Sequence, residues 1–286
     1  MNDMSDHAQN NHATTKHEYT MGHSKASTAT HEARTINTDA KFLLPHIKPQ
    51  HRILDVGCGP GTITTGFASL VSPGNVVGVD YSLEVVERAQ ELAKSNGLAD
   101  KVSFIQGNLV ERLPFEDSSF DIVFASQVFG HLQPSENAIK ALKECRRVLK
   151  LGGLLAVRDA AKMTWFPFTE ELDRVFTQRL WKAVGSDNFG GFHMRSWLRE
   201  AGFDVEDESK VNIGGGCEVY ANRAKCQWRC DTLRSRLAKG EQFRESWLRV
   251  GITEEECDET VELLNKWAMQ DSAFYGILHT EALARS

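Results

Sequence analysis

The 286-residue sequence has no long apolar run and no cluster of basic residues. No uninterrupted apolar stretch is long enough to cross a bilayer, and the first thirty residues are polar and rich in histidine, without the apolar centre of a signal peptide. The net charge is −6, whereas neutralising nucleic-acid phosphates needs clustered lysine and arginine. These absences predict a cytoplasmic protein with no membrane span and no nucleic-acid partner, acting on a small molecule.

Cysteine is scarce and scattered along the chain. The six cysteines do not form the regular pattern of a disulfide framework, so we expect reduced thiols. Cys226 and Cys230 fall on one face of an expected helix, but a closed zinc site needs four ligands and no second pair matches them. The sequence therefore predicts no metal site.

Hydrophobic residues make up 41% of the chain and charged residues 25%, as in one ordinary globular domain. Residues 1–16 show no periodicity and predict a disordered tail. Residues 17–48 are compatible with helices, residues 49–160 alternate strands and helices, and residues 161–286 add further helices and the last strands. This alternation predicts an α/β fold in which a parallel sheet is wrapped on both faces, which is a doubly wound architecture.

One short segment, Leu54–Thr62, says most about the chain. It places Gly57, Gly59 and Gly61 at alternate positions directly after the apolar run Arg52–Val56. Glycine is used where the backbone must reach positive φ or come very close to a ligand. The segment therefore predicts a strand that runs into a tight turn, with a ligand lying against the backbone.

A second apolar run ends at Asp80, nineteen residues after Gly61. A doubly wound fold places a carboxylate there to accept from the hydroxyls of a ribose. The third glycine does not match the dinucleotide fingerprint G-x-G-x-x-G, and Asp55, just ahead of the turn, would repel a pyrophosphate but suit an ammonium group. The pattern favours a nucleoside that carries an amino acid, and an NAD-dependent dehydrogenase is the disfavoured alternative.

The glycine turn resembles motif I of the class I S-adenosylmethionine-dependent methyltransferases. Further matches follow in the family's order at the ends of the second and third strands, the fourth strand and the turn before the fifth: Asp80-Tyr81-Ser82, Phe104–Leu109, Phe120–Ala125 and Arg147–Gly153. The last of these, together with His131-Leu132, is most similar to the ubiquinone/menaquinone-biosynthesis type. The resemblance covers about residues 19–159.

The resemblance implies S-adenosylmethionine as the cofactor. It also implies a Rossmann-like sheet of seven strands with an N-terminal helical lid, residues 17–48, and inserted C-terminal helices. Asn108 stands where the family usually has an aspartate that accepts from the adenine amino group, and an amide oxygen accepts there without a full charge. Tyr19 and His23 are either polar contacts of the lid or surface residues. The implied cofactor-binding residues are Tyr19, Asp55, Gly57, Cys58, Gly59, Gly61, Thr62, Asp80, Tyr81, Gly107, Asn108, Leu109 and Gln127.

Methyl transfer is an in-line displacement that needs positioning and exclusion of water, and only a poor nucleophile also needs a base. The end of the fourth strand is expected to point at the methyl group. His131 is the candidate base because an imidazole accepts a proton near neutral pH, and it equally often orders a loop. Asp159 is a second candidate, although capping or pairing with Arg158 or Lys162 is its commoner role. The residues expected to line the reaction centre are Ser126, Gln127, Phe129, His131 and Leu132.

Aromatic residues after the fifth strand are expected to select the substrate, and core packing explains at least half of them. Trp165 and Phe189 fall in expected loops, which makes them the better candidates for ligand contact. The full set is Met163, Trp165, Phe166, Phe168, Phe189 and Phe192, with His193 nearby; Phe129, Trp165, Phe189, Phe192 and His193 are the predicted substrate contacts.

The same region predicts a helix from Phe168 to Leu180, a short helix from Ser196, a sixth strand that begins at Phe203–Val205, and a last antiparallel strand, Phe274–Leu283. Two inserted helices are expected at Cys217–Leu237 and Thr253–Met269. The reaction predicted is methylation of a small quinone-like or natural-product acceptor at carbon, oxygen, nitrogen or sulfur. A protein that keeps the cofactor for a non-methylating role is the alternative. The oligomeric state and the role of the inserted helices stay open.

Overall fold

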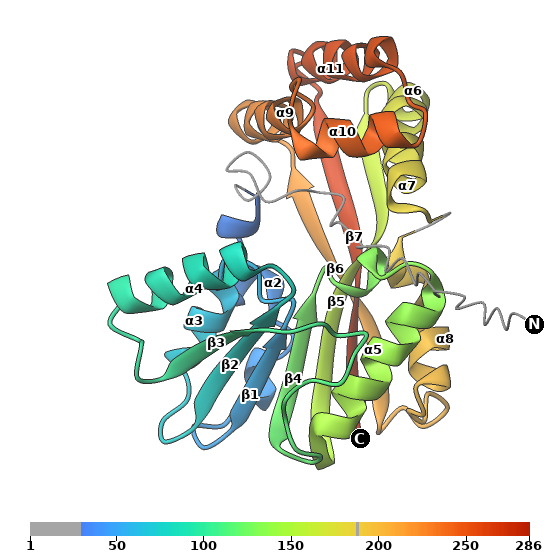
Figure 1. The fold of residues 1–286 in the computed structure, drawn as a ribbon. Coiled ribbons are helices and arrows are strands. Elements are labelled where there is room, and N and C mark those ends of the chain that lie inside the picture. The colour runs from blue at the N-terminus through green and yellow to red at the C-terminus, as the bar shows by residue number, and fades with distance from the viewer. Residues whose placement is uncertain (1–29, 187–188) are drawn as a thin grey trace, which may run out of the picture.

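The computed structural model describes residues 30–186 and 189–286, and Figure 1 shows its fold. One seven-stranded sheet has the order β3-β2-β1-β4-β5-β7-β6. Its first five strands are parallel to one another, and β7 runs antiparallel to both β5 and β6. The strands are β1 (Arg52–Val56), β2 (Asn75–Asp80), β3 (Val102–Gln106), β4 (Phe120–Ser126), β5 (Leu149–Phe166), β6 (Val211–Tyr220) and β7 (Phe274–Arg285). The doubly wound α/β prediction is confirmed.

Helices cover both faces of the parallel part of the sheet, because alternate strand residues point to opposite faces. Ile53 packs with the helices of one face and Leu54 with those of the other. The first face carries α2 (Ile36–Asp39), α3 (Thr62–Ala68) and α4 (Leu83–Ser95). The second face carries α5 (Ser135–Val148) and α8 (Gly190–Glu200) (Figure 1).

The local signals for α4 are confirmed. The hydroxyl of Ser82 accepts from the backbone N–H of Val85 at the N-terminus of the helix. Gly97, just past the C-cap residue Asn96, has a φ of +67°, which glycine adopts without steric cost. Both ends of this helix were therefore readable from residues next to it in the sequence.

A helical cap rises beyond the carboxyl edge of the parallel strands (Figure 1). Strands β5 and β7 stay paired from Leu154 and Arg285 up to Phe166 and Phe274, with a register shift between Ala160 and Lys162. The cap surrounds their upper ends and has its own core, in which Trp165 packs edge-on against Trp267. It consists of α6 (Thr169–Leu172), the π-helical turn η3 (Asp173–Thr177), α7 (Gln178–Val184), α9 (Arg223–Arg236), α10 (Gln242–Arg249) and α11 (Glu254–Ala268).

Several expected boundaries after residue 160 are wrong. The sixth strand begins at Val211 and not at Phe203–Val205, because residues 204–211 form turns in which the N–H groups of Asp207, Lys210 and Val211 donate to carbonyl groups three or four positions earlier. Strand β6 runs through Cys217 to Tyr220, so the helix predicted at Cys217–Leu237 begins only at Arg223. The helix predicted from Phe168 to Leu180 is divided by η3, and α8 begins at Gly190, before the expected Ser196.

Helix α10 has no counterpart among the elements predicted from the sequence. The second inserted helix, α11, was expected, and Thr253 and Glu256 form the predicted capping box at its start. In the part of the chain that the structure describes, no helix has the length and apolar content needed to cross a bilayer.

Candidate functional site

The glycine turn after β1 has the backbone that its sequence predicts. Gly57, Gly59 and Gly61 have φ values of +66°, +54° and +81°. A Cβ atom on Gly57 would lie 2.4 Å from Val128, and one on Gly61 would lie 2.9 Å from Ala89. A Cβ atom on Gly59 would meet nothing within 4 Å. Two glycines are thus required by packing, and the middle one leaves its face of the turn open to a ligand.

Asp80 stands at the carboxyl end of β2, beside the glycine turn. Its Oδ2 accepts from the backbone N–H of Gly59 and its Oδ1 from that of Ser82, both at 3.0 Å. A carboxylate has about four lone-pair positions, so two remain for further donors. The carboxylate therefore holds the turn in place and still has the capacity to accept from two ribose hydroxyls.

The end of β3 lies next to Asp80 in the sheet. A Cβ atom on Gly107 would lie 2.8 Å from Val79, so glycine is required there. Asn108 accepts from the N–H of Val110 through its side-chain oxygen, at 3.2 Å, and one lone pair of that oxygen stays available for an adenine amino group. The side chain of Leu109 is buried in the core, so only its backbone can reach a ligand. Tyr81 is half-exposed.

Two predicted contacts lie beneath the turn and not on its surface. Asp55 is 2% exposed, and its carboxylate accepts from the hydroxyl of Thr64 at 2.6 Å. Burial raises the pKa of Asp55 to about 7, against the opposing effect of the Thr64 hydrogen bond. Cys58 is buried among apolar side chains, and burial raises the pKa of its thiol well above the ordinary value. Both side chains reach a ligand only through the backbone that they support.

The N-terminal strap, residues 30–46, lies against the turn and its helix. The hydroxyl of Thr62 donates to the carbonyl oxygen of His31 at 3.3 Å. Ile36 packs on Gly66 so closely that a Cβ atom there would lie 2.6 Å from it. The predicted contacts Tyr19 and His23 lie outside the described residues. The strap therefore corresponds only to the later part of the expected lid.

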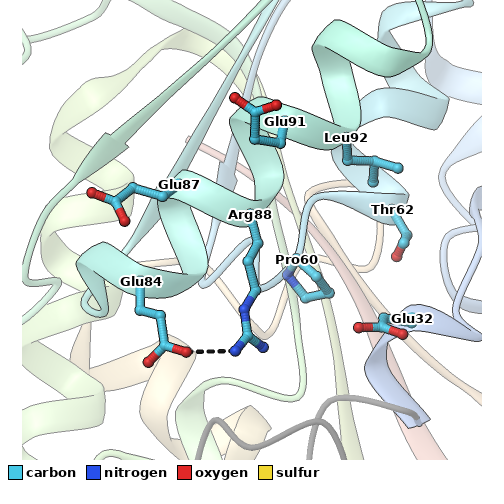
Figure 2. A pocket seen from close by; sticks show the side chains of 8 residues that line it. All are labelled: Glu32, Pro60, Thr62, Glu84, Glu87, Arg88, Glu91 and Leu92. Atoms are coloured by element: carbon cyan, nitrogen blue, oxygen red, sulfur yellow. Dashed lines mark hydrogen bonds and ion pairs between the residues drawn. The ribbon is translucent and has the colours of Figure 1, made fainter.

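A cavity of about 630 Å³ opens on the outer side of the turn, between the strap and α4 (Figure 2). Its walls carry four glutamates and one arginine, and Arg88 is paired with Glu84. This acidic lining disfavours a phosphate or a carboxylate, and the predicted ribose acceptor Asp80 is not part of it. The lining residues are Glu32, Pro60, Thr62, Glu84, Glu87, Arg88, Glu91 and Leu92.

The expected reaction centre lies where β4 ends, beside Arg158–Ala160 in the middle of β5. Gln127 has a φ of +59°, its N–H donates to the carbonyl of Arg158 at 2.8 Å, and its side-chain oxygen accepts from the N–H of Ala160 at 3.2 Å. His131 ends the short helix η2 (Phe129–His131). Burial, with smaller contributions from the charges of Arg34 and Arg236, lowers the pKa of His131 to about 4.

Asp159 has a structural position next to this centre. Its two oxygens accept from the backbone N–H groups of Gly130 and Ala160, each at 3.1 Å, which ties η2 to β5. Burial raises the pKa of Asp159 to about 6. It forms no ion pair with Arg158 or Lys162, both of which are described. Its capping role agrees with the commoner interpretation of the sequence, but its expected partners were wrong.

Two of the predicted substrate contacts are core residues. Trp165 is 1% exposed because β5 continues through it to Phe166, where the sequence predicted a loop. Phe129 is fully buried in the core with α5 and α8. Neither side chain can touch a substrate without disrupting its core.

The other predicted contacts lie beside α8. Phe189 packs edge-on against Trp181, and His193 stacks on Trp197 with a ring separation of 5.2 Å. Phe192 is 56% exposed. The backbone of Gly190, next to Phe189, lies against Gly130 of η2, and the role of these three side chains in substrate binding stays a prediction.

A buried ion network beside the reaction centre was not predicted. Arg158 is 4% exposed, and it donates to Asp39 of the strap at 3.0 Å and to Glu281 of β7 at 3.3 Å. The sequence feature that could have predicted this network is the position of Arg158 within the apolar run Leu154–Ala161, since a buried charge needs a partner. This feature does not identify the partner residues.

Comparison with known proteins identifies the family to which the chain is similar. The model of a methyltransferase domain family matches residues 47–202. Probable methyltransferase ltbC of Aspergillus luteorubrus is 38% identical over 275 residues, which are 93% of this chain and 96% of that protein. A UbiE ubiquinone/menaquinone biosynthesis C-methyltransferase of Ectopseudomonas mendocina is 34% identical over 42% of this chain and 45% of that protein. The crystal structure of a putative methyltransferase of Bacillus halodurans shares the fold, with a TM-score of 0.55, 21% identity, and coverage of 86% and 97% of the two chains.

Proposed function

The chain belongs to the class I S-adenosylmethionine-dependent methyltransferases and methylates a small molecule, and we propose that it does so by positioning the acceptor, without a general base. We place the acceptor at the carboxyl end of β4, beside the middle of β5 and beneath the helical cap. The observation that carries this proposal is the burial of His131, the candidate base that follows β4. The other candidate, Asp159, has both carboxylate oxygens engaged by backbone N–H groups.

The cofactor is placed across the glycine turn. Asp80 accepts from the ribose hydroxyls, the open face at Gly59 lets the nucleoside lie against the backbone, and Asn108 accepts from the adenine amino group. The strand order supports this placement, because β3, β2 and β1 are neighbours and their carboxyl ends meet at one edge. The methyl group then points toward β4 and β5, on the other side of β1.

The low pKa of His131 disfavours proton abstraction by this side chain. A pKa of about 4 is far below the pKa of a phenol or a thiol, so His131 would accept little of the acceptor's proton in the transition state. An acceptor that is already nucleophilic needs only alignment with the methyl and exclusion of water. We therefore infer that the acceptor atom is an activated ring carbon, an ionised phenol or a thiolate. Such atoms occur in quinol-like and natural-product substrates, so this inference agrees with the substrate classes predicted from the sequence.

Other features support a small acceptor in the cytosol. The net charge of −6 disfavours a nucleic-acid partner. All six cysteines are free thiols, which suits a reducing compartment.

The experiment is a screen for transfer of labelled methyl from S-adenosylmethionine to phenols, quinols, thiols and amines, with S-adenosylhomocysteine as the common product. With the acceptor so found, His131→Gln is expected to keep turnover within about tenfold of the natural protein, with an unchanged pH–rate profile between pH 6 and 9. A loss of about 100-fold or more, or disappearance of a titrating limb, would restore His131 as the base. Formation of no S-adenosylhomocysteine with any acceptor would favour the non-methylating alternative.

A further inference from the structure

Within residues 30–186 and 189–286, the guanidinium of Arg34 has hydrogen-bond donors without an acceptor, close to the expected reaction centre. Arg34 lies on the N-terminal strap, and its side chain is 27% exposed. Its closest acidic atom is Oδ1 of Asp39, at 4.0 Å, and the side chain donates no hydrogen bond to any residue of the described ranges. An arginine has five N–H donors in a fixed fork, so this group is ready for an anionic ligand.

The counter-ion that Arg34 approaches is already used by another arginine. Oδ1 of Asp39 accepts from Arg158 at 3.0 Å, and Oδ2 accepts from the hydroxyl of Thr38 at 2.7 Å. Arg158 is held from its other side by Glu281. This buried network fixes the strap against the sheet, and among the described residues it leaves the donors of Arg34 without an acceptor at hydrogen-bond distance.

Arg34 lies on the side of the cofactor site that faces away from the adenosine positions. The charge of Arg34 contributes to lowering the pKa values of His131 and His279, and it also acts to lower the pKa of Asp159. His131 follows β4, His279 lies on β7 and Asp159 lies on β5. Three positions before Arg34, the carbonyl of His31 accepts from Thr62 at the start of α3. The guanidinium therefore stands between the glycine turn and the region where β4 ends beside Asp159 of β5.

The sheet order determines which end of the cofactor lies there. Asp80 and Asn108 end β2 and β3, on one side of β1, whereas β4 and β5 lie on its other side. A nucleoside bound at Asp80 and Asn108 must extend across the glycine turn, with its amino-acid end toward β4. That end carries one carboxylate.

We propose that Arg34 binds the carboxylate of the methionine moiety of S-adenosylmethionine. A guanidinium and a carboxylate form two parallel, charge-assisted hydrogen bonds, which are stronger than neutral ones. The inference rests on the proposed placement of the cofactor across the glycine turn. It assigns to the strap a direct role in cofactor binding, in addition to its packing against α3.

The test compares two ligands that differ at this end. Isothermal titration measures binding of S-adenosylhomocysteine and of 5′-deoxy-5′-methylthioadenosine, which lacks the amino-acid group. Arg34→Gln is expected to weaken the binding of S-adenosylhomocysteine about 10- to 100-fold and to change the affinity for methylthioadenosine by no more than about twofold. Lys41→Gln is the matched control, since it removes one positive charge from the same strap at a side chain without an ion pair in the described structure, and both affinities are expected to stay within twofold.

The outcomes separate this inference from the proposed function. Unchanged binding of S-adenosylhomocysteine to Arg34→Gln, or an equal loss for both ligands, would overturn the assignment while leaving the cofactor site intact. Failure of the natural protein to bind S-adenosylhomocysteine at all would remove the cofactor placement and this inference with it. Arg34→Lys keeps the charge without the planar fork, so an affinity between those of the natural protein and Arg34→Gln is expected, and full retention would contradict paired hydrogen bonding.

Discussion

Replacing Asp80 with alanine tests the placement of the cofactor most directly. The carboxylate holds two backbone N–H groups, on Gly59 and Ser82, each at 3.0 Å. With two ribose hydroxyls added, the carboxylate would accept four hydrogen bonds, and each bond to a charged group contributes about 1.5–3 kcal/mol when buried. Asp80 is partly exposed, so we discount the ribose pair to about 2–4 kcal/mol in total.

That loss corresponds to a dissociation constant roughly 30- to 700-fold higher for S-adenosylhomocysteine. The effect on folding is smaller, because the two freed N–H groups are at a partly exposed turn where water replaces the carboxylate, at a cost of about 0.5–1.5 kcal/mol each. Isothermal titration well below the melting temperature separates the two effects. Circular dichroism confirms that the variant is folded.

Two further variants sharpen the result. Asp80→Asn keeps one acceptor oxygen, so its affinity is expected to lie between those of the natural protein and the alanine variant. Asp100→Ala removes an exposed carboxylate from the loop after α4 and is expected to leave affinity unchanged. An affinity for Asp80→Ala within threefold of the natural protein would refute the ribose assignment.

Gly61→Ala should lower the free energy of unfolding by about 2–4 kcal/mol, because left-handed strain adds to the contact of 2.9 Å with Ala89, whereas Gly97→Ala, with a similar φ and open space, should lower it by only about 1–2 kcal/mol. Urea titration measures both, and equal losses would contradict the packing argument. Asp55→Asn tests pH dependence: the folded-state pKa of Asp55 is raised from 3.8 to about 7, so its ionisation destabilises the fold as pH rises through that interval. The stability of Asp55→Asn relative to the natural protein should therefore grow by about 2–4 kcal/mol between pH 4 and pH 7.5, and a constant difference would refute a raised pKa.

The cofactor half of the molecule was predictable because its signals are local. The glycines of Leu54–Thr62 have the positive φ values that their spacing predicts, and Asp80 reaches the turn from the next strand. Helix α4 is bounded by Ser82 and Gly97, as expected. In each case the residues that determine the conformation are neighbours in sequence, or lie on adjacent parallel strands whose ends must meet.

The acceptor half was predictable only in outline. Trp165 lies on β5, which continues beyond its register shift at Ala160–Lys162, and the cap buries this side chain against Trp267 and Tyr275. Aromatic side chains in this region therefore form a second core, where the sequence suggested a substrate pocket. The same spacing of apolar residues fits both interpretations, because periodicity shows which face is buried and not what buries it.

The glycine turn, the doubly wound sheet and the family resemblance could be inferred from the sequence, because they depend on short-range backbone requirements, on the alternation of strands and helices and on ordered local motifs. The sequence did not reveal which charged groups meet beside the end of β4. Asp39 and Arg158 are separated by 119 residues, and Arg158 and Glu281 by 123. Their contact depends on the order β4-β5-β7, on the antiparallel register of β7 and on the path of the strap, and no local pattern encodes these.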